Sequence, residues 1–155
     1  MKKLVINQTF AADYFEDFHE MTGTELARFY GCAGNRCGIY DEEAHTAIIV
    51  TWTKPKLAFL TDERSVLKGA EMQLKRNLQD YRHVETLNTE IAGCQAIGNR
   101  FEYTANGTDV VQYGDLYVFK YNKLYYGIQL IARKEGFDAS QKEMERFLQS
   151  VALIG

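Results

Sequence analysis

The sequence predicts an α+β domain in which helices flank a central antiparallel β-sheet of about six or seven strands, ending in a meander. Residues 96–133 carry the alternation and turn signals of four consecutive strands in two hairpins, and residues 37–53 carry those of another hairpin. Residues 62–81 and the segment after Gly136 have the spacing of one-sided helices. The 155 residues suit one domain, residues 1–155, with a single core.

Two turns containing asparagine set the predicted strand pairing of residues 96–133. Asn106-Gly107 suits a two-residue type I′ turn, because both central positions need a positive φ, and it places Tyr103 opposite Val110. A second turn at Asn122-Lys123 predicts three apolar pairs on the floor of the core: Tyr121 with Leu124, Phe119 with Tyr126, and Tyr117 with Ile128. The reverse face of that hairpin is expected to be lightly covered.

The beginning of the chain is expected to supply a strand, a connection and a short helix. Residues 3–10 have the composition of an opening strand, and residues 11–21 are expected to cover the sheet. Thr22 and Glu25 match a capping box, in which each side chain satisfies a backbone N–H of the other residue. A helix over residues 24–30 should follow.

The middle of the chain predicts a covered hairpin and a long amphipathic helix. The second arm of the hairpin over 37–53 is apolar on both faces, which is typical of a strand covered on both sides, so helices are expected on both faces of the sheet. Pro55 should end this arm, because proline cannot donate to the ladder. The helix over 62–81 has the apolar positions Leu67, Ala70, Leu74, Leu78 and Tyr81. A strand over 83–92 follows, and the last helix has the apolar positions Met144, Phe147, Leu148 and Val151.

Charge and hydropathy narrow the classes of partner. The net charge of −3 and the pI of about 5.6 argue against nucleic acid or an anionic membrane as the main partner, but leave room for a local basic patch. The apolar run of residues 4–6 is too short for a secretion signal, and no segment approaches the ~20 apolar residues of a membrane span. Three cysteines, an odd count, are typical of a reducing compartment. We therefore expect a cytoplasmic protein.

The cysteines give one loose pair, Cys32 and Cys37, with Cys94 and His45 elsewhere. A structural zinc site usually presents two close pairs, so the spacing favours small buried or loop thiols over a metal site. Two alternatives stay open: a redox disulfide between Cys32 and Cys37, and a nucleophilic pair of Cys37 with His45 across the hairpin. Thiol counts with and without reductant, together with metal analysis, would test the metal site and the disulfide. Loss of a hydrolase activity in Cys37→Ala would be needed to support the nucleophilic pair.

The sequence contains no motif that fixes a reaction or a cofactor. The glycine-containing stretches 31–38 and 68–72 match neither G-x-x-x-x-G-K-[ST] nor G-x-G-x-x-G after a strand. The three histidines are scattered, and the carboxylates of residues 41–43 are best explained as a solvated turn. We therefore expect no catalytic residues, no cofactor, no metal and no enzymatic activity.

Aromatic residues are the one excess in the composition, with ten Tyr, nine Phe and one Trp. Most of them are expected in the core. Tyr113 and Tyr125 fall on the less apolar faces of their strands, near Arg100 and Lys120 in the predicted sheet. Exposed Tyr and Arg are enriched at protein interfaces, so these four residues form the predicted protein-contact site.

The order of these elements, with the stretches GCQAIGNRFEYTANG (93–107) and LYYGIQLIA (124–132), resembles the PsbP-like superfamily. This superfamily includes the PsbP photosystem proteins, a Ran-binding nuclear import factor and the bacterial DcrB-like proteins. The resemblance covers nearly the whole chain and implies an αβα sandwich around an antiparallel sheet. It also implies a protein that binds other proteins rather than one that catalyses, since some bacterial relatives act as chaperones for secreted toxins.

Two functional hypotheses follow. The first is a non-catalytic cytoplasmic adaptor or chaperone-like module that binds an unknown protein partner through the sheet or its edge. The second is a carrier of a small molecule or lipid in an aromatic-lined cavity between sheet and helices. The sequence indicates neither the partner nor the oligomeric state.

Overall fold

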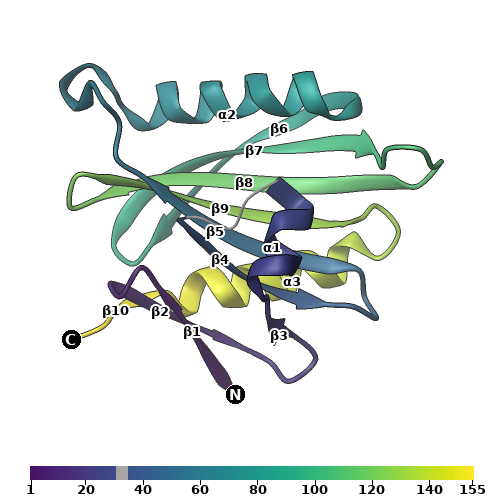
Figure 1. The fold of residues 1–155 in the computed structure, drawn as a ribbon, viewed down its shortest axis with the longest axis horizontal. Coiled ribbons are helices and arrows are strands. Elements are labelled where there is room, and N and C mark those ends of the chain that lie inside the picture. Colours follow the sequence, from purple (N-terminus) through teal and green to yellow (C-terminus); the bar gives the residue numbers. More distant parts are fainter. Residues whose placement is uncertain (31–34) are drawn as a thin grey trace.

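Strands dominate the chain over residues 1–30 and 35–155, the residues that this computed structural model describes. In chain order the elements are β1 (Lys2–Ile6), β2 (Phe10–Tyr14), β3 (His19–Glu20), α1 (Gly23–Tyr30), β4 (Arg36–Asp41), β5 (Thr46–Thr53), the 3₁₀ turn η1 (Ala58–Leu60), α2 (Glu63–Asn77), β6 (Gln79–Ile91), β7 (Cys94–Thr104), β8 (Val111–Tyr121), β9 (Leu124–Arg133), α3 (Phe137–Ser150) and β10 (Ala152–Leu153). Seven of the described strands form a large sheet with the order β3-β4-β5-β9-β8-β7-β6, and three form a small sheet with the order β1-β2-β10 (Figure 1). All neighbouring strands are antiparallel, which confirms the predicted α+β class.

β8 and β9 form the hairpin that the sequence predicts at Asn122-Lys123. Asn122 and Lys123 have φ values of 48° and 68°, and a type I′ turn requires positive φ at both of these positions. The predicted pairing is confirmed in full: Tyr121 with Leu124, Phe119 with Tyr126, and Tyr117 with Ile128. All six side chains lie in or against the largest buried cluster, so this face is the floor of the core.

The turn at Asn106-Gly107 differs from the prediction, and the register derived from it is wrong by two residues. Tyr103 lies opposite Gln112 rather than Val110. A longer loop closes here because Thr108 donates its backbone N–H and its hydroxyl to the Ala105 carbonyl, at 3.1 and 2.8 Å. Only the glycine of the Asn-Gly pair has a positive φ, so the two-residue turn does not form.

The four strands predicted over 96–133 are three, because β8 runs unbroken through Gly114. Phe101 in β7 lies directly opposite this glycine. A Cβ built on Gly114 would meet the Phe101 ring at 2.2 Å, so the ring occupies the space that a side chain would need. Phe101 is itself stacked between Tyr81 and Tyr103, with ring centroids 5.6 and 5.9 Å away. The glycine therefore serves close packing within a strand and does not mark a break.

The beginning of the chain also corrects the prediction, because residues 3–10 and 11–21 supply a hairpin instead of one strand and a connection. β1 ends at Ile6, and Asn7 and Gln8 have φ values of 50° and 55°, which reverse the chain into β2. The Thr9 N–H closes this turn on the Ile6 carbonyl at 3.0 Å. Buried residues alternate along both strands, a period-2 pattern that the continuous-strand interpretation missed.

The elements predicted between residues 22 and 53 are confirmed. The capping box closes α1, with Thr22 N–H donating to Glu25 Oε1 at 3.0 Å and Glu25 N–H donating to Thr22 Oγ1 at 3.2 Å. β5 is buried on both faces: Ile48 and Val50 join the cluster on the α3 side, and Ala47 and Ile49 join a cluster under α1. β5 ends at Thr53, two residues before the proline.

α2 is shorter than predicted. Its first turn is closed by Asp62, whose carboxylate accepts the Ser65 N–H at 2.8 Å. The helix ends at Asn77, because Leu78 is extended, and β6 follows directly from Gln79. The left-handed Asp80, with φ of 56°, lies within β6 at the register shift between Gln79 and Arg82. The predicted helix over 62–81 is therefore wrong by about one turn at its end, and β6 starts before the predicted residue 83. No helix among the described residues has the length and hydropathy of a membrane-spanning segment.

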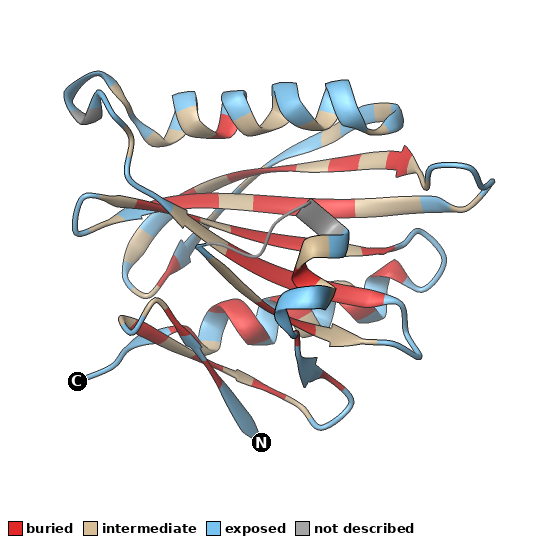
Figure 2. Cartoon of the chain, viewed as in Figure 1, coloured by how far each residue is buried: buried red, intermediate tan, exposed pale blue. Residues whose placement is uncertain are grey.

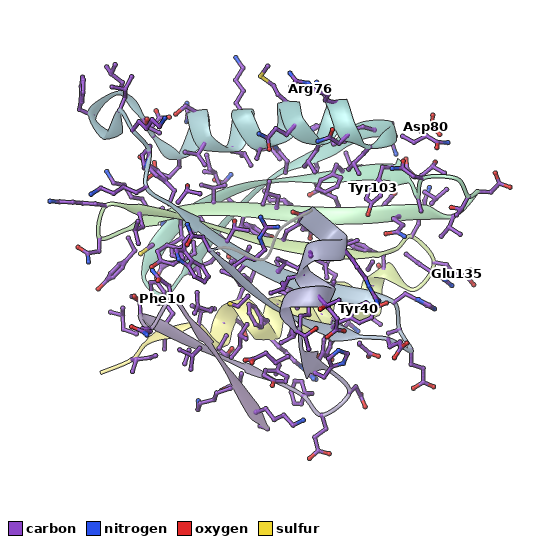
Figure 3. All side chains as sticks on the ribbon, viewed as in Figure 1. Phe10, Tyr40, Arg76, Asp80, Tyr103 and Glu135 are labelled. Atoms are coloured by element: carbon purple, nitrogen blue, oxygen red, sulfur yellow. The ribbon has the colours of Figure 1, made fainter. Side chains whose placement is uncertain are left out.

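The largest core lies between the large sheet, the small sheet and α3. The last helix buries Met144, Phe147 and Leu148, as its spacing predicts. Phe10 of the small sheet, labelled in Figure 3, reaches the large sheet. Its ring contacts those of Phe119, Tyr121 and Tyr126 edge-on, with centroids 5.1 to 5.8 Å apart. These contacts fix the small sheet against the large sheet beside α3.

The packing of Gly114 gives a test of stability. We expect Gly114→Ala to lower the free energy of unfolding by about 1–3 kcal/mol, because the new methyl group displaces the wedged Phe101 ring. Urea unfolding followed by circular dichroism measures the change. Gly69→Ala in α2 is the matched control: no atom lies within 4 Å of its Cβ, and alanine should stabilise the helix by up to ~1 kcal/mol. Wild-type stability of Gly114→Ala would contradict this packing.

Candidate functional site

The helices cover the two faces of the large sheet unequally. α3 buries five residues, whereas the 15-residue α2 fully buries only Leu67. Figure 2 shows the outward side of α2 exposed and its inner side mostly of intermediate burial. Val66, Ala70, Leu74 and Leu78 pack against the sheet but stay partly accessible. The face of the sheet that α2 covers is therefore incompletely closed.

A long groove lies along this incompletely closed face. One hollow of about 780 Å³ extends between α2, β5 and β9, and a second of about 680 Å³ continues it below the β5–α2 loop. Six residues line both hollows, which makes the groove continuous: Thr51, Thr53, Ala70, Gln73, Leu116 and Gly127. Pockets for drug-sized ligands have volumes of roughly 300–1,000 Å³. The groove as a whole is therefore large enough for a segment of polypeptide.

Small residues on the sheet and on α2 leave the space that forms the groove. Thr51 of β5 pairs with Gly127 of β9, so a short side chain meets a residue with no side chain in the middle of the sheet. On α2, Gly69 and Ala70 face the hollow where larger residues would fill it. Amphipathic spacing brings Gln73 and Ala70 to the same side of the helix. The groove thus follows from small residues on two facing elements.

The groove has a polar end with positive charge. Arg28 and Arg36 line the hollow near β4, and the lining of both hollows includes no carboxylate among the described residues. Further along, Ile49, Leu116 and Ile131 give an apolar floor. Figure 3 labels Tyr103, which lines the groove from β7 beneath α2. An apolar occupant with an acidic end would complement this lining.

The four residues of the predicted contact site do not share a surface. Tyr125 is only 3% exposed and donates its hydroxyl to the Thr61 carbonyl at 2.7 Å, so the exposure expected of it is wrong. The Tyr125 side chain packs with Leu67 of α2. α2 therefore covers this part of the reverse face more fully than predicted. Lys120 is exposed, with its ammonium 5.6 Å from the Tyr125 ring centroid.

The other two predicted contact residues lie on the opposite face, near the start of α3. Arg100 donates from Nε and Nη2 to the two carboxylate oxygens of the buried Asp115, at 2.7 and 3.0 Å. Its guanidinium also lies 5.2 Å from the Phe137 ring, and its pKa is raised, first of all by the hydrogen bonds to Asp115. Tyr113 is half-buried, edge-on to Phe137 at 5.0 Å. The role of these residues in binding a protein stays a prediction.

The cysteines and histidines that the structure describes do not gather. Cys32 lies outside the described residues, so its pairing with Cys37 stays a prediction. Cys37 pairs with Val50, whereas His45 lies in the turn at the other end of the hairpin, about 13 Å away along the strand at ~3.3 Å per residue. The nucleophilic pair of Cys37 with His45 is therefore wrong. The described residues hold no group of three side chains arranged to bind a metal ion.

Burial distinguishes the two described thiols. Cys37 packs against the main core, and this desolvation raises its pKa to about 12, with a smaller contribution from Glu20. Burial also raises the pKa of Cys94, though less. Since the thiolate is the reactive form, Cys37 is held in an unreactive state.

We expect iodoacetamide to alkylate Cys94 faster than Cys37 in the folded protein at about pH 8, because less desolvation opposes its thiolate. Peptide mass spectrometry over a time course measures both rates. In urea the two rates should converge, since unfolding removes the difference in burial. Equal rates in the folded protein would contradict the burial of Cys37.

Comparisons with known proteins place the fold. No protein-family model matches the sequence, and no curated protein matches it by sequence. Cyanobacterial PsbP (CyanoP) from Synechocystis sp. PCC 6803 superposes with a TM-score of 0.65 at 8% identity, covering 99% of this chain and 92% of its own.

Two further solved structures have the same fold as this chain. The Ran-binding protein Mog1p from Saccharomyces cerevisiae has a TM-score of 0.62 at 7% identity, covering 98% of this chain and 94% of its own. LpqN from Mycobacterium tuberculosis, involved in cell envelope biogenesis, has a TM-score of 0.62 at 15% identity, covering 94% and 83%. The chain thus has the fold of the PsbP and Mog1p structures, as the sequence resemblance implies.

Proposed function

We propose that this chain is a non-catalytic cytoplasmic adaptor or chaperone-like module that holds a segment of a partner protein in the groove between α2 and β5. The observation that carries the proposal is the partly buried apolar face of α2 opposite a low sheet floor. A helix normally buries its apolar stripe against the core. A bound segment would complete the burial that the chain leaves unfinished.

The charges of the groove suggest which segment binds. Arg28 and Arg36 lie at one end, and apolar side chains follow towards the β5–α2 loop. A mainly apolar segment with a carboxylate at one end would pair its charge with the arginines and bury its remainder over Leu116 and Leu74. The name of the Ran-binding Mog1p, whose fold this chain shares, agrees with a protein partner.

A photo-crosslinking amino acid at Gln73 tests this function in the cells that make the protein. We expect one covalent partner, because Gln73 lines both hollows. Adding Ala70→Trp should reduce the adduct at least about tenfold, since the indole fills the groove. Met72→Trp is the matched control, because Met72 is 55% exposed on the same helix and lines neither hollow, and should leave the adduct unchanged. An undiminished adduct in Ala70→Trp would contradict the proposal, as would labelling no stronger than from Met72.

A second candidate is a carrier of a small apolar molecule or lipid. It is favoured by the second hollow, where Leu57, Leu60 and Tyr125 surround the end of the groove. Such a lining suits an acyl chain better than a polar ligand.

Native mass spectrometry of gently purified protein distinguishes the carrier from the adaptor. A carrier should retain a non-covalent adduct of constant mass, and Ala70→Trp should lose it while Met72→Trp keeps it. Detection of the bare chain alone, from preparations that still capture the Gln73 crosslink, would contradict the carrier and leave the adaptor.

A further inference from the structure

The loop between β5 and α2 presents three large apolar side chains to solvent. Leu57, Phe59 and Leu60 are 56%, 82% and 71% exposed. The loop projects beyond the large sheet next to the start of α2 (Figure 1). Single exposed apolar residues are ordinary, but three within four positions on one projecting loop form a continuous apolar tip.

The apolar tip has a fixed shape. The Leu60 N–H donates to the Leu57 carbonyl at 3.0 Å and closes the turn η1. The Thr61 hydroxyl donates to the same carbonyl at 2.8 Å. The capping box of Asp62 and Ser65 then starts α2 directly. Hydrogen bonds therefore fix the backbone on both sides of Leu60, in the turn and at the start of the helix.

The segments near the tip carry a net positive charge, although the chain as a whole is acidic. Residues 54–68 and 120–123 contain six Lys or Arg and two Asp or Glu, a net charge of +4 against −3 for the whole chain. The six cations are Lys54, Lys56, Arg64, Lys68, Lys120 and Lys123. None of these six forms a salt bridge among the residues that the structure describes.

The two segments lie close together. The Tyr125 hydroxyl is bonded to the carbonyl of Thr61, just after the tip, and the Lys120 ammonium lies 5.6 Å from the same ring. Arg64 and Lys120 also line one shared hollow. The turn between β8 and β9 emerges on the same side of the sheet as the β5–α2 loop (Figure 1). The cations of both segments thus lie at the same end of the sheet as the apolar side chains.

We propose that the loop of residues 54–60 docks this protein on an anionic lipid surface, with Leu57, Phe59 and Leu60 inserted between the headgroups. Apolar side chains next to Lys or Arg are the combination that binds anionic bilayers from one side. A protein interface fits less well, because lysine is depleted at such interfaces. This surface lies at the end of the groove but does not depend on what the groove binds.

Co-sedimentation of the full chain with vesicles tests the proposal. We expect binding to vesicles of equal parts phosphatidylcholine and phosphatidylglycerol, and weak binding to phosphatidylcholine alone. Phe59→Ser should weaken binding roughly tenfold or more, since it removes the most exposed inserted side chain. Lys54→Gln with Lys56→Gln should weaken binding and flatten its dependence on salt. Met72→Ser is the matched control, because Met72 is also a large exposed apolar residue, 55% exposed, but lies away from the loop; this variant should bind like wild type.

Insertion has its own readout. Lipids brominated on the acyl chain should quench the tryptophan fluorescence of Phe59→Trp more strongly than that of wild type. The only tryptophan of wild type is the half-buried Trp52. Wild-type binding by Phe59→Ser, equal binding to both vesicle types, or no binding to anionic vesicles would each overturn the proposal. So would loop variants that lose the Gln73 crosslink while binding vesicles normally, because that result assigns the loop to a protein contact. Circular dichroism confirms that each variant is folded.

Discussion

The pairing of β8 with β9 is the constraint on which the rest of the structure depends. Successive side chains of a strand point to opposite faces, so a shift of one residue would exchange the core with the groove. The left-handed Asn122-Lys123 turn fixes the register that sends Tyr126 and Ile128 towards α3. It sends Gly127 and Gln129 towards the groove. One turn therefore decides both where the protein is closed and where it is open.

The unequal cover of the two faces is what gives the fold a binding surface. On the α3 side, the aromatic contacts of Phe10 and the ion pair of Arg100 with Asp115 pack the core closely. On the other side, α2 rests on the β6–β8 half of the sheet, and small residues separate it from β5. Two helices share this face: α1 packs over Ala47 and Ile49, α2 packs over Phe101 and Val118, and the groove lies between them. The remaining area is available to a partner.

Sequence reasoning succeeded where local chemistry decides the structure and failed where distant contacts decide it. The capping box at Thr22, the turn at Asn122 and the apolar spacing of α3 were all predictable from neighbouring residues. The register after Asn106 depended on a Thr108 hydroxyl bond, and the continuity of β8 depended on Phe101, a neighbour in space only. The sequence hypothesis of a cavity between sheet and helices did not locate the groove, because the groove depends on small residues that meet only in the fold, Gly127 and Ala70. The basic loop around Lys56 was also missed, because the net charge of the whole chain is negative and does not report a local excess of lysine.

The contact between β2 and β10 has a consequence for how the protein is made. Ala152 pairs with Ala11, and the Ile154 N–H donates to the Thr9 carbonyl at 3.0 Å, so this ladder joins residues about 140 positions apart. During synthesis the amino-terminal hairpin must wait for nearly all of the following chain before its free edge is satisfied. An uncovered edge strand readily pairs with other chains. The nascent polypeptide is thus exposed to misassembly until translation has passed Leu153.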